Sequence, residues 1–325
     1  MRRYQLVCVN LAACILMLLG GNTGADEPAS RTFVFNYGAL IKDLPADAKV
    51  RVWLPMPQSN DHQQVKIVST QIPGDAQAAQ EKKYGNKVLY FEPNESGDVD
   101  FRISYLITRK EVHGLAKRDS VEKLPKEQAE RFLAANHLVP LGGKPETLIT
   151  DLTLSDEPLE LGKQLYERVD EHMRYDKSQP GYGNGDAAWA CDSRFGNCTD
   201  FHSLFISFAR TKKLPAKFEI GFPLPPERGE GKIGGYHCWA QFHAEGHGWV
   251  PVDISEADKH PEMKKYYFGN LTEDRVTFTT GRDIDLIPKQ AGPPLNYFVY
   301  PYVEVDGKPW PKEKIDLAFS YADQK

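Results

Sequence analysis

The sequence predicts an α+β protein in which a β-sandwich precedes a domain of helices packed on an antiparallel sheet. Three observations favour this class. Hydrophobic residues make up 41% of the 325 residues and charged residues 26%, which are proportions of a folded protein and not of a disordered one. Up to about residue 112, short runs of alternating apolar and polar residues indicate strands. After residue 150, apolar residues recur instead with helical spacing.

The first 25 residues have the layout of a signal peptide. Arg2 and Arg3 precede an apolar stretch at 6–19, and small residues follow up to Ala25. A spanning helix needs about 20 apolar residues, so cleavage near Ala25 is favoured over an uncleaved anchor. We therefore expect export to the periplasm or the extracellular space, with no stable membrane insertion after cleavage.

The remaining chain divides by composition. Residues 30–112 are predicted to form the β-sandwich, residues 113–150 a linker, residues 151–260 the helical core, and residues 261–325 a C-terminal β extension packed on that core. The 45 acidic and 40 basic residues are interspersed and give a formal net charge of −5. Without a basic stripe to neutralise phosphates, nucleic acid is not an expected partner.

Within the core, helical spacing predicts a first helix over 157–175, for which Ser155 is available as a cap. A second helix opens at Cys198, directly after a Gly-Asn pair, and ends before Pro215. We expect one buried stripe on it, formed by Phe201, Leu204, Phe205 and Phe208. A strand over 217–222, a loop over 223–235 and a hairpin over 237–253 follow.

Cysteine number and position single out Cys198. Loss of residues 1–25 leaves Cys191, Cys198 and Cys238. Because three is an odd number, at least one thiol must stay free or pair between chains in an oxidising compartment. Cys198 stands at the first turn of its helix, where backbone N–H groups and the helix dipole stabilise a thiolate. A structural cysteine is the alternative at this point.

The hairpin supplies partners for that thiol. If its reversal is centred on Glu245, His237 lies directly opposite Asp253 on the same face of the sheet. A register one residue different would place Cys238 opposite Asp253 instead. In the first register, Cys198 is the candidate nucleophile, His237 the general base and Asp253 the group that orients it. The backbone N–H of Cys198 is the first candidate donor to an oxyanion.

Several short motifs then resemble the transglutaminase-like superfamily, which shares the papain-like fold, over roughly residues 159–254. They are Gly196-Asn197-Cys198-Thr199-Asp200-Phe201, Leu214-Pro215-Ala216-Lys217, His237-Cys238-Trp239-Ala240 and Gly248-Trp249-Val250-Pro251-Val252-Asp253. The resemblance carries the family's three catalytic positions onto Cys198, His237 and Asp253. The flanking segments are similar to those of exported bacterial members. Cys238 departs from the small or apolar residue that many members carry, and either a disulfide with Cys191 or a buried thiol would accommodate it.

The resemblance implies cysteine-dependent amide acyl transfer through a thioester, with a protein or peptide as substrate. Hydrolysis of peptide or isopeptide bonds, by a protease or amidase, is the favoured outcome. Cross-linking of glutamine to lysine amines, by a transglutaminase, is the alternative. A non-catalytic binding or envelope scaffold is the alternative from another class, because a fold does not guarantee a function.

Other polar residues have structural interpretations. Asp200, in the first helical turn, is expected to cap the helix and complement its dipole. His202 is expected to be an ordinary, partly exposed helix residue. A zinc site among Cys191, Cys198, His202, His243 and His247 is not favoured, because the short paired spacing of structural sites is missing and zinc would consume the thiolate. We therefore expect neither a metal nor a cofactor, and the sequence does not indicate an oligomeric state.

Overall fold

The computed structural model describes residues 27–117 and 123–324. The predicted signal peptide, residues 1–25, lies outside the described residues. Within the described residues, no helix combines the length and the apolar character needed to cross a membrane.

The first sheet is built from both ends of the chain. Its strand order is β3-β6-β1-β16-β9, where the strands are β3 (Gln63–Gln71), β6 (Gly97–Lys110), β1 (Ser30–Leu44), β16 (Ile315–Asp323) and β9 (Glu230–Lys232). From Arg31 to Tyr37 every second residue of β1 is buried. This is the burial expected of a strand with one face against a core, so the predicted alternation is confirmed there.

A second sheet faces the first. Its order is β15-β14-β2-β5-β4, formed by β15 (Lys308–Pro309), β14 (Tyr302–Val305), β2 (Val50–Met56), β5 (Lys87–Phe91) and β4 (Gln77–Gln80). Phe91 of this sheet packs against Phe101 of the first, with ring centroids 6.0 Å apart. The two sheets therefore share one core, as in a β-sandwich.

The C-terminal segment is divided between the two parts of the molecule. Residues 261–325 are predicted as an extension packed on the helical core, and β13 (Arg275–Thr280) does join the core sheet. However, β14 pairs with β2, and β16 pairs with β1 along nine residue positions from Phe33↔Asp323 to Ile41↔Ile315. The sandwich is therefore completed by strands from the far end of the chain.

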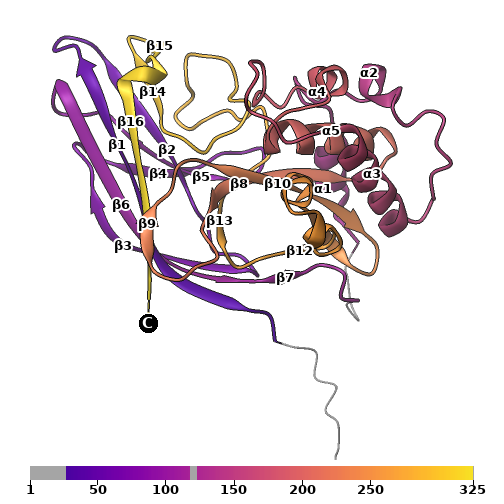
Figure 1. Cartoon of the computed structure of the whole chain (residues 1–325). Coiled ribbons are helices and arrows are strands. Elements are labelled where there is room, and N and C mark those ends of the chain that lie inside the picture. Colours follow the sequence, from indigo (N-terminus) through magenta and orange to yellow (C-terminus); the bar gives the residue numbers. More distant parts are fainter. Residues whose placement is uncertain (1–26, 118–122, 325) are drawn as a thin grey trace, which may run out of the picture.

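The core sheet has the order β11-β10-β8-β13, with β11 (Gly248–Val252), β10 (His237–Ala244) and β8 (Ala216–Pro223) beside β13. Its principal helices are α3 (Pro158–His172), α4 (Ala187–Ser193) and α5 (Cys198–Thr211). Phe222 of β8 packs on Phe319 of β16, with ring centroids 4.6 Å apart. Figure 1 shows the resulting layers, with the long strands on one side, the helices on the other, and β8 and β10 between them.

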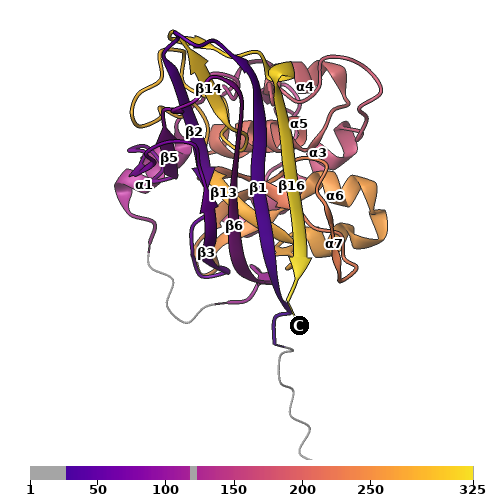
Figure 2. The ribbon, with the colours of Figure 1, turned by 90° about the vertical axis from the view of Figure 1, so that its left-hand side faces the viewer.

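Shorter elements connect these layers. They are β7 (Val112–His113), which pairs with β12 (Asn270–Leu271), α1 (Lys126–Leu133), α2 (Gly143–Glu146), α6 (Ile254–Lys259), η1 (Pro261–Met263), α7 (Lys264–Tyr267) and η2 (Lys312–Lys314). Turned by 90°, the molecule presents the first sheet to the viewer, with α3 and α5 behind it (Figure 2).

Helix α5 is the centre of the core. The four residues of its predicted stripe are fully buried, and every residue from Cys198 to Arg210 is buried as well. Phe205 of α5 packs on Phe242 of β10, with centroids 6.1 Å apart. Helix α3 begins at Pro158, so the prediction of Ser155 as its cap is wrong; the Ser155 hydroxyl instead accepts a bond from the backbone N–H of Glu157. A helix enclosed on all sides holds its first turn in a fixed position.

Candidate active site

The start of α5 positions Cys198. Asn197 is the N-cap, and its side chain accepts a hydrogen bond from the backbone N–H of Thr199 at 2.9 Å. In return, the Asp200 carboxylate accepts a hydrogen bond from the Asn197 N–H at 3.0 Å, which completes a capping box. This confirms the capping role expected of Asp200. The Cys198 thiol therefore lies at the positive end of a fourteen-residue helix.

Asp200 also holds the glycine-rich loop that precedes the helix. Its two carboxylate oxygens accept bonds from the N–H groups of Gly183 and Gly185 at 2.8 and 2.9 Å. Burial raises the pKa of Asp200 to about 6, although these backbone donors act in the opposite direction. The carboxylate thus ties the loop to the first turn of α5.

The hairpin has a different register from the predicted one. Ala240 pairs with Val252 and Ala244 pairs with Gly248, so the reversal is centred on Gly246 and not on Glu245. The loop needs a positive φ at its middle residue, and Gly246 supplies it at +81°. The prediction that His237 pairs directly with Asp253 across the two strands is therefore wrong.

The two side chains nevertheless meet. Strand β11 ends at Val252, and Asp253 leaves the sheet as the N-cap of α6. Its Oδ2 lies 2.8 Å from His237 Nε2. Nε2 is engaged with Asp253, and the pKa values of His237 and Cys198 each depend on the other residue, which places the imidazole next to the thiol.

Buried charges set the ionisation of these groups. Burial raises the pKa of Cys198, but hydrogen bonds from Cys238 and His237 and the charge of His237 outweigh it and hold that pKa well below its ordinary value. Burial lowers the pKa of His237, yet Asp253 and Cys198 raise it to about 10. A thiolate–imidazolium pair is the consistent state near neutral pH.

Arg275 was missed by the sequence reasoning. Its Nη1 lies 2.8 Å from Asp253 Oδ2, the oxygen that also contacts His237, and its guanidinium stacks 4.9 Å from the centre of the Trp239 ring. Arg275 belongs to β13, outside the segment that carries the recognised motifs. No local sequence signal indicates it, because only the pairing of β13 with β8 brings it to the site.

His202 differs from its prediction as a partly exposed residue, since it is fully buried. Its Nε2 accepts a bond from the Ile254 N–H at 3.0 Å, so the proton is on Nδ1, which donates to the Cys198 carbonyl at 2.7 Å. Burial lowers the pKa of His202 and keeps the ring neutral. His202 therefore links the backbone of the cysteine helix to the segment that follows Asp253.

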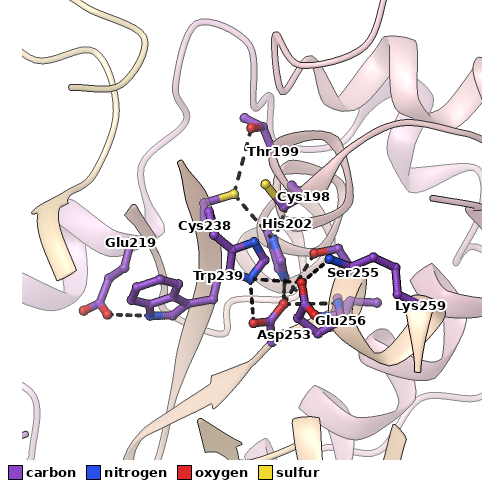
Figure 3. A network of polar contacts seen from close by, with 12 residues as sticks. Cys198, Thr199, His202, Glu219, Cys238, Trp239, Asp253, Ser255, Glu256 and Lys259 are labelled. Atoms are coloured by element: carbon purple, nitrogen blue, oxygen red, sulfur yellow. Dashed lines mark hydrogen bonds and ion pairs between the residues drawn. The ribbon is translucent and has the colours of Figure 1, made fainter. Parts of the chain in front are cut away.

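The three cysteines of the described residues are all free thiols. Cys238 and Cys198 extend from β10 and α5 with their sulfur atoms near one another (Figure 3), and the Cys238 sulfur lies 3.7 Å from His202 Nδ1. Cys191 instead contacts the carbonyl of Lys144, 3.6 Å from its sulfur. Burial raises the pKa of both Cys191 and Cys238. Of the three thiols, only Cys198 has a lowered pKa.

One group in the described residues has the composition of a metal site. Donor atoms of His237, Asp253 and Glu256 lie within 4.8 Å of one another. However, His237 and Arg275 already share the Asp253 oxygen, and Lys259 forms an ion pair with Glu256. Two neighbouring cations oppose the binding of a metal ion, so the arrangement fits a hydrogen-bonded network better than a metal centre.

Helices on one face of an antiparallel sheet, with a buried cysteine at a helix start beside a His–Asp pair, are the features of the papain-like class of folds. Residues 147–254 match the family model of the transglutaminase-like superfamily, so this part of the chain is a transglutaminase-like core. This fold supports cysteine-dependent acyl transfer in general.

Comparisons over the length of the chain found similar proteins in three bacteria. A solved structure of a candidate cysteine protease from Cytophaga hutchinsonii matches with a TM-score of 0.56 and 13% identity, covering 92% of this chain and 99% of that chain. An uncharacterised protein of Haemophilus influenzae is 28% identical over 88% of this chain and 89% of its own length. The periplasmic domain of TgpA from Pseudomonas aeruginosa covers 73% of this chain at 16% identity, with a TM-score of 0.37.

Proposed function

We propose that the protein is a cysteine hydrolase of peptide or isopeptide bonds in which Cys198, His237 and Asp253 act as nucleophile, general acid–base and orienting group. The observation that carries the proposal is the 2.8 Å contact between His237 Nε2 and Asp253 Oδ2 beside a thiol of lowered pKa. The structural similarity to a candidate cysteine protease also supports hydrolysis.

In this mechanism the Cys198 thiolate attacks the amide carbon, and the imidazolium of His237 gives its proton to the leaving amine as the C–N bond breaks. Water then attacks the thioester, His237 accepts its proton, and the carboxylic acid leaves as the C–S bond breaks. The backbone N–H of Cys198 would donate to the oxyanion. If a lysine amine replaced water, the product would be a cross-link.

Little of the proposed catalytic pair is open to solvent. Cys198 is 3% exposed and His237 5% exposed. A substrate that reaches both groups must therefore present a slender, extended segment, as a peptide or a side-chain amide does. We propose a protein or peptide as substrate, encountered after export directed by residues 1–25.

The first test is alkylation by limiting iodoacetamide between about pH 4 and about pH 9, read by mass spectrometry. We expect Cys198 to be labelled well below pH 8, while Cys191 and Cys238 react only at alkaline pH. His237→Ala should move Cys198 labelling towards an ordinary thiol pKa of about 8.5. His243→Ala, on the same strand but outside the proposed triad, should not. The intact mass of protein purified from the exporting cells reports whether residues 1–25 are removed.

A peptide screen with and without added amines follows from a positive result. Release of amine in water alone supports hydrolysis, whereas incorporation of an added amine supports the cross-linking alternative. If Cys198 proves no more reactive than the other two thiols and does not respond to His237→Ala, the proposed chemistry is wrong and a scaffold role replaces it.

A further inference from the structure

A second candidate site lies on the other face of the core sheet. In β10, Phe242 points towards α5, so strand alternation directs Gln241 and His243 away from it. These two residues line a cavity of about 480 Å³ together with Arg109, Lys217, Glu219 and Trp249. None of the residues that line this cavity belongs to the proposed triad.

Arg109 is the unusual group in this cavity. It is 2% exposed, and its Nε has no hydrogen-bond partner in the part of the chain that the structure describes. Its Nη1 has only long contacts of 3.4 Å, to the side-chain oxygens of Gln63 and Thr277. Among the described residues, no carboxylate forms an ion pair with it. A buried guanidinium normally has such a partner, because an isolated charge is costly to remove from water.

The neighbouring charges are already matched. Lys217 Nζ lies 3.0 Å from Glu219 Oε1, and the other oxygen of Glu219 accepts bonds from Trp239 Nε1 at 2.8 Å and Gln241 Nε2 at 2.7 Å. Figure 3 shows the Trp239–Glu219 bond. Arg275 is paired with Asp253. The charge of Glu219 also acts on Arg109, but its ion pair is with Lys217, and the exposed Asp61 that lines the cavity forms no ion pair with Arg109. Arg109 therefore has no ion-paired carboxylate of its own among the described residues.

Arg31 shows how the same chain pairs a buried arginine. Its Nε and Nη2 hold the two carboxylate oxygens of Asp323 at 2.7 and 2.8 Å. In Arg109 the Nε atom of this same edge has no acceptor among the described residues. Burial and the charge of Arg275 lower the pKa of Arg109 to about 10, although the charge of Glu219 acts in the opposite direction, so the side chain stays charged at neutral pH.

We propose that this cavity binds a carboxylate group, with Arg109 as its counter-ion. A planar carboxylate matches the guanidinium fork and supplies the missing negative charge. Gln241, His243 and Trp249 would border the remainder of the ligand. The carboxylate could belong to a free small acid or to the C-terminus of a peptide, which the probes below distinguish. This site is separate from the proposed triad and does not depend on its chemistry.

The test is isothermal titration calorimetry of the full chain carrying Cys198→Ala, in a chloride buffer free of carboxylates. The probes are acetate, succinate, inorganic phosphate, acetamide, and one short peptide with either a free or an amidated C-terminus. We expect saturable binding of at least one carboxylate and none of acetamide or the amidated peptide. Acetate binding indicates a small-acid site; binding of the free peptide alone indicates a peptide terminus.

Arg109→Gln should weaken the binding about tenfold or more, because a charge-assisted hydrogen bond is lost. Arg102→Gln makes the same change of charge on an exposed position of the same strand and should leave the affinity unchanged. If Arg109→Gln does not fold, the comparison of acid with amide remains decisive. Absence of carboxylate binding, equal binding of acetamide or phosphate, or binding that survives in folded Arg109→Gln overturns the proposal.

Discussion

Asp253 receives two cations on one carboxylate oxygen. His237 Nε2 and Arg275 Nη1 each lie 2.8 Å from Oδ2, and the carboxylate is fully buried. Burial raises the pKa of Asp253, but these two charges outweigh it and hold the pKa far below its ordinary value. Asp253 therefore stays ionised at neutral pH and holds the imidazole in one orientation, without itself taking up a proton.

Arg275→Met should destabilise the protein strongly. Removal of one partner from a buried pair typically costs about 3–5 kcal/mol. We expect a value near the lower end here, because His237 still pairs with Asp253 when Arg275 is lost. Arg228→Met is the control: Arg228 is half-exposed and pairs with Glu273 and Asp274, so its loss should cost less than about 1 kcal/mol. Urea unfolding at neutral pH measures both free energies.

The stability difference between wild type and Arg275→Met should depend on pH. A depressed carboxyl pKa contributes stability above the unfolded-state value of about 3.9, and this contribution is lost as the pH falls towards the folded-state value. The difference between wild type and Arg275→Met should therefore narrow in acid. An unchanged difference down to pH values where both proteins remain folded would show that Arg275 stabilises by packing and not by its charge on Asp253.

Local sequence predicts part of the proposed site. Cys198, His237 and Asp253 stand in short motifs whose residue types suggest their roles. Arg275 could not be found in this way, because its contact depends on which strand lies beside β8. The burial of His202 was also missed, since it depends on α6 closing over a helix face that the sequence pattern alone leaves undetermined.

At the scale of elements, β8 connects the proposed site to the sandwich. Gly221 of β8 pairs with His237 on one side and with Thr277 on the other. A Cβ atom at Gly221 would lie 1.8 Å from the carbonyl oxygen of Val276, which is part of the β13 backbone. The close approach of these two strands therefore requires glycine at this position.

Gly221→Ala should separate β13 from β8 and displace Arg275 from Asp253. Overpacking of this kind usually costs about 1–3 kcal/mol, and here backbone must move. Thiol labelling at neutral pH should slow as well, because Asp253 and His237 lose part of their alignment. Gly234→Ala is the matched control, since nothing lies within 4 Å of its added Cβ. Wild-type stability and labelling in Gly221→Ala would contradict the assigned role of this contact.

Element prediction succeeded where the pattern is local. The stripe of α5 and the hairpin strands follow from spacing alone, and both are present. The predicted hairpin register is wrong because the turn is centred one residue later than expected. The sequence does not fix this centre, since Gly246 and Gly248 both provide the backbone freedom that a loop needs. The presence of the two strands was therefore predictable from the sequence, whereas the residues that pair across them were not.

At the scale of the whole molecule, Arg31 joins three distant segments. Its nearly fully buried side chain pairs with Asp323 of β16 and, at 2.7 Å, with Asp274, the residue before Arg275. The guanidinium of Arg31 thus connects the first strand, the last strand and the segment that leads into β13. Composition divided the chain into successive segments, but it could not indicate this contact, because the paired residues are separated by more than 240 positions.

This arrangement predicts that the sandwich and the transglutaminase-like core unfold together. Arg31→Met should lower the urea midpoints of the sandwich and of the core by the same amount. Hydrogen exchange of β1 measures the midpoint of the sandwich, and the reactivity of the Cys191 and Cys238 thiols measures that of the core. Loss of one partner of a buried ion pair is expected to cost about 3–5 kcal/mol.

Lys42→Met is the control, because the ion pair of Lys42 with Asp316 lies on the same two strands but is largely exposed. It should change neither midpoint measurably. If Arg31→Met instead shifts the sandwich midpoint and leaves the core midpoint in place, the two parts are independently stable. The C-terminal strands would then serve only the sandwich, and Arg275 would keep its contact with Asp253 without support from the first strand.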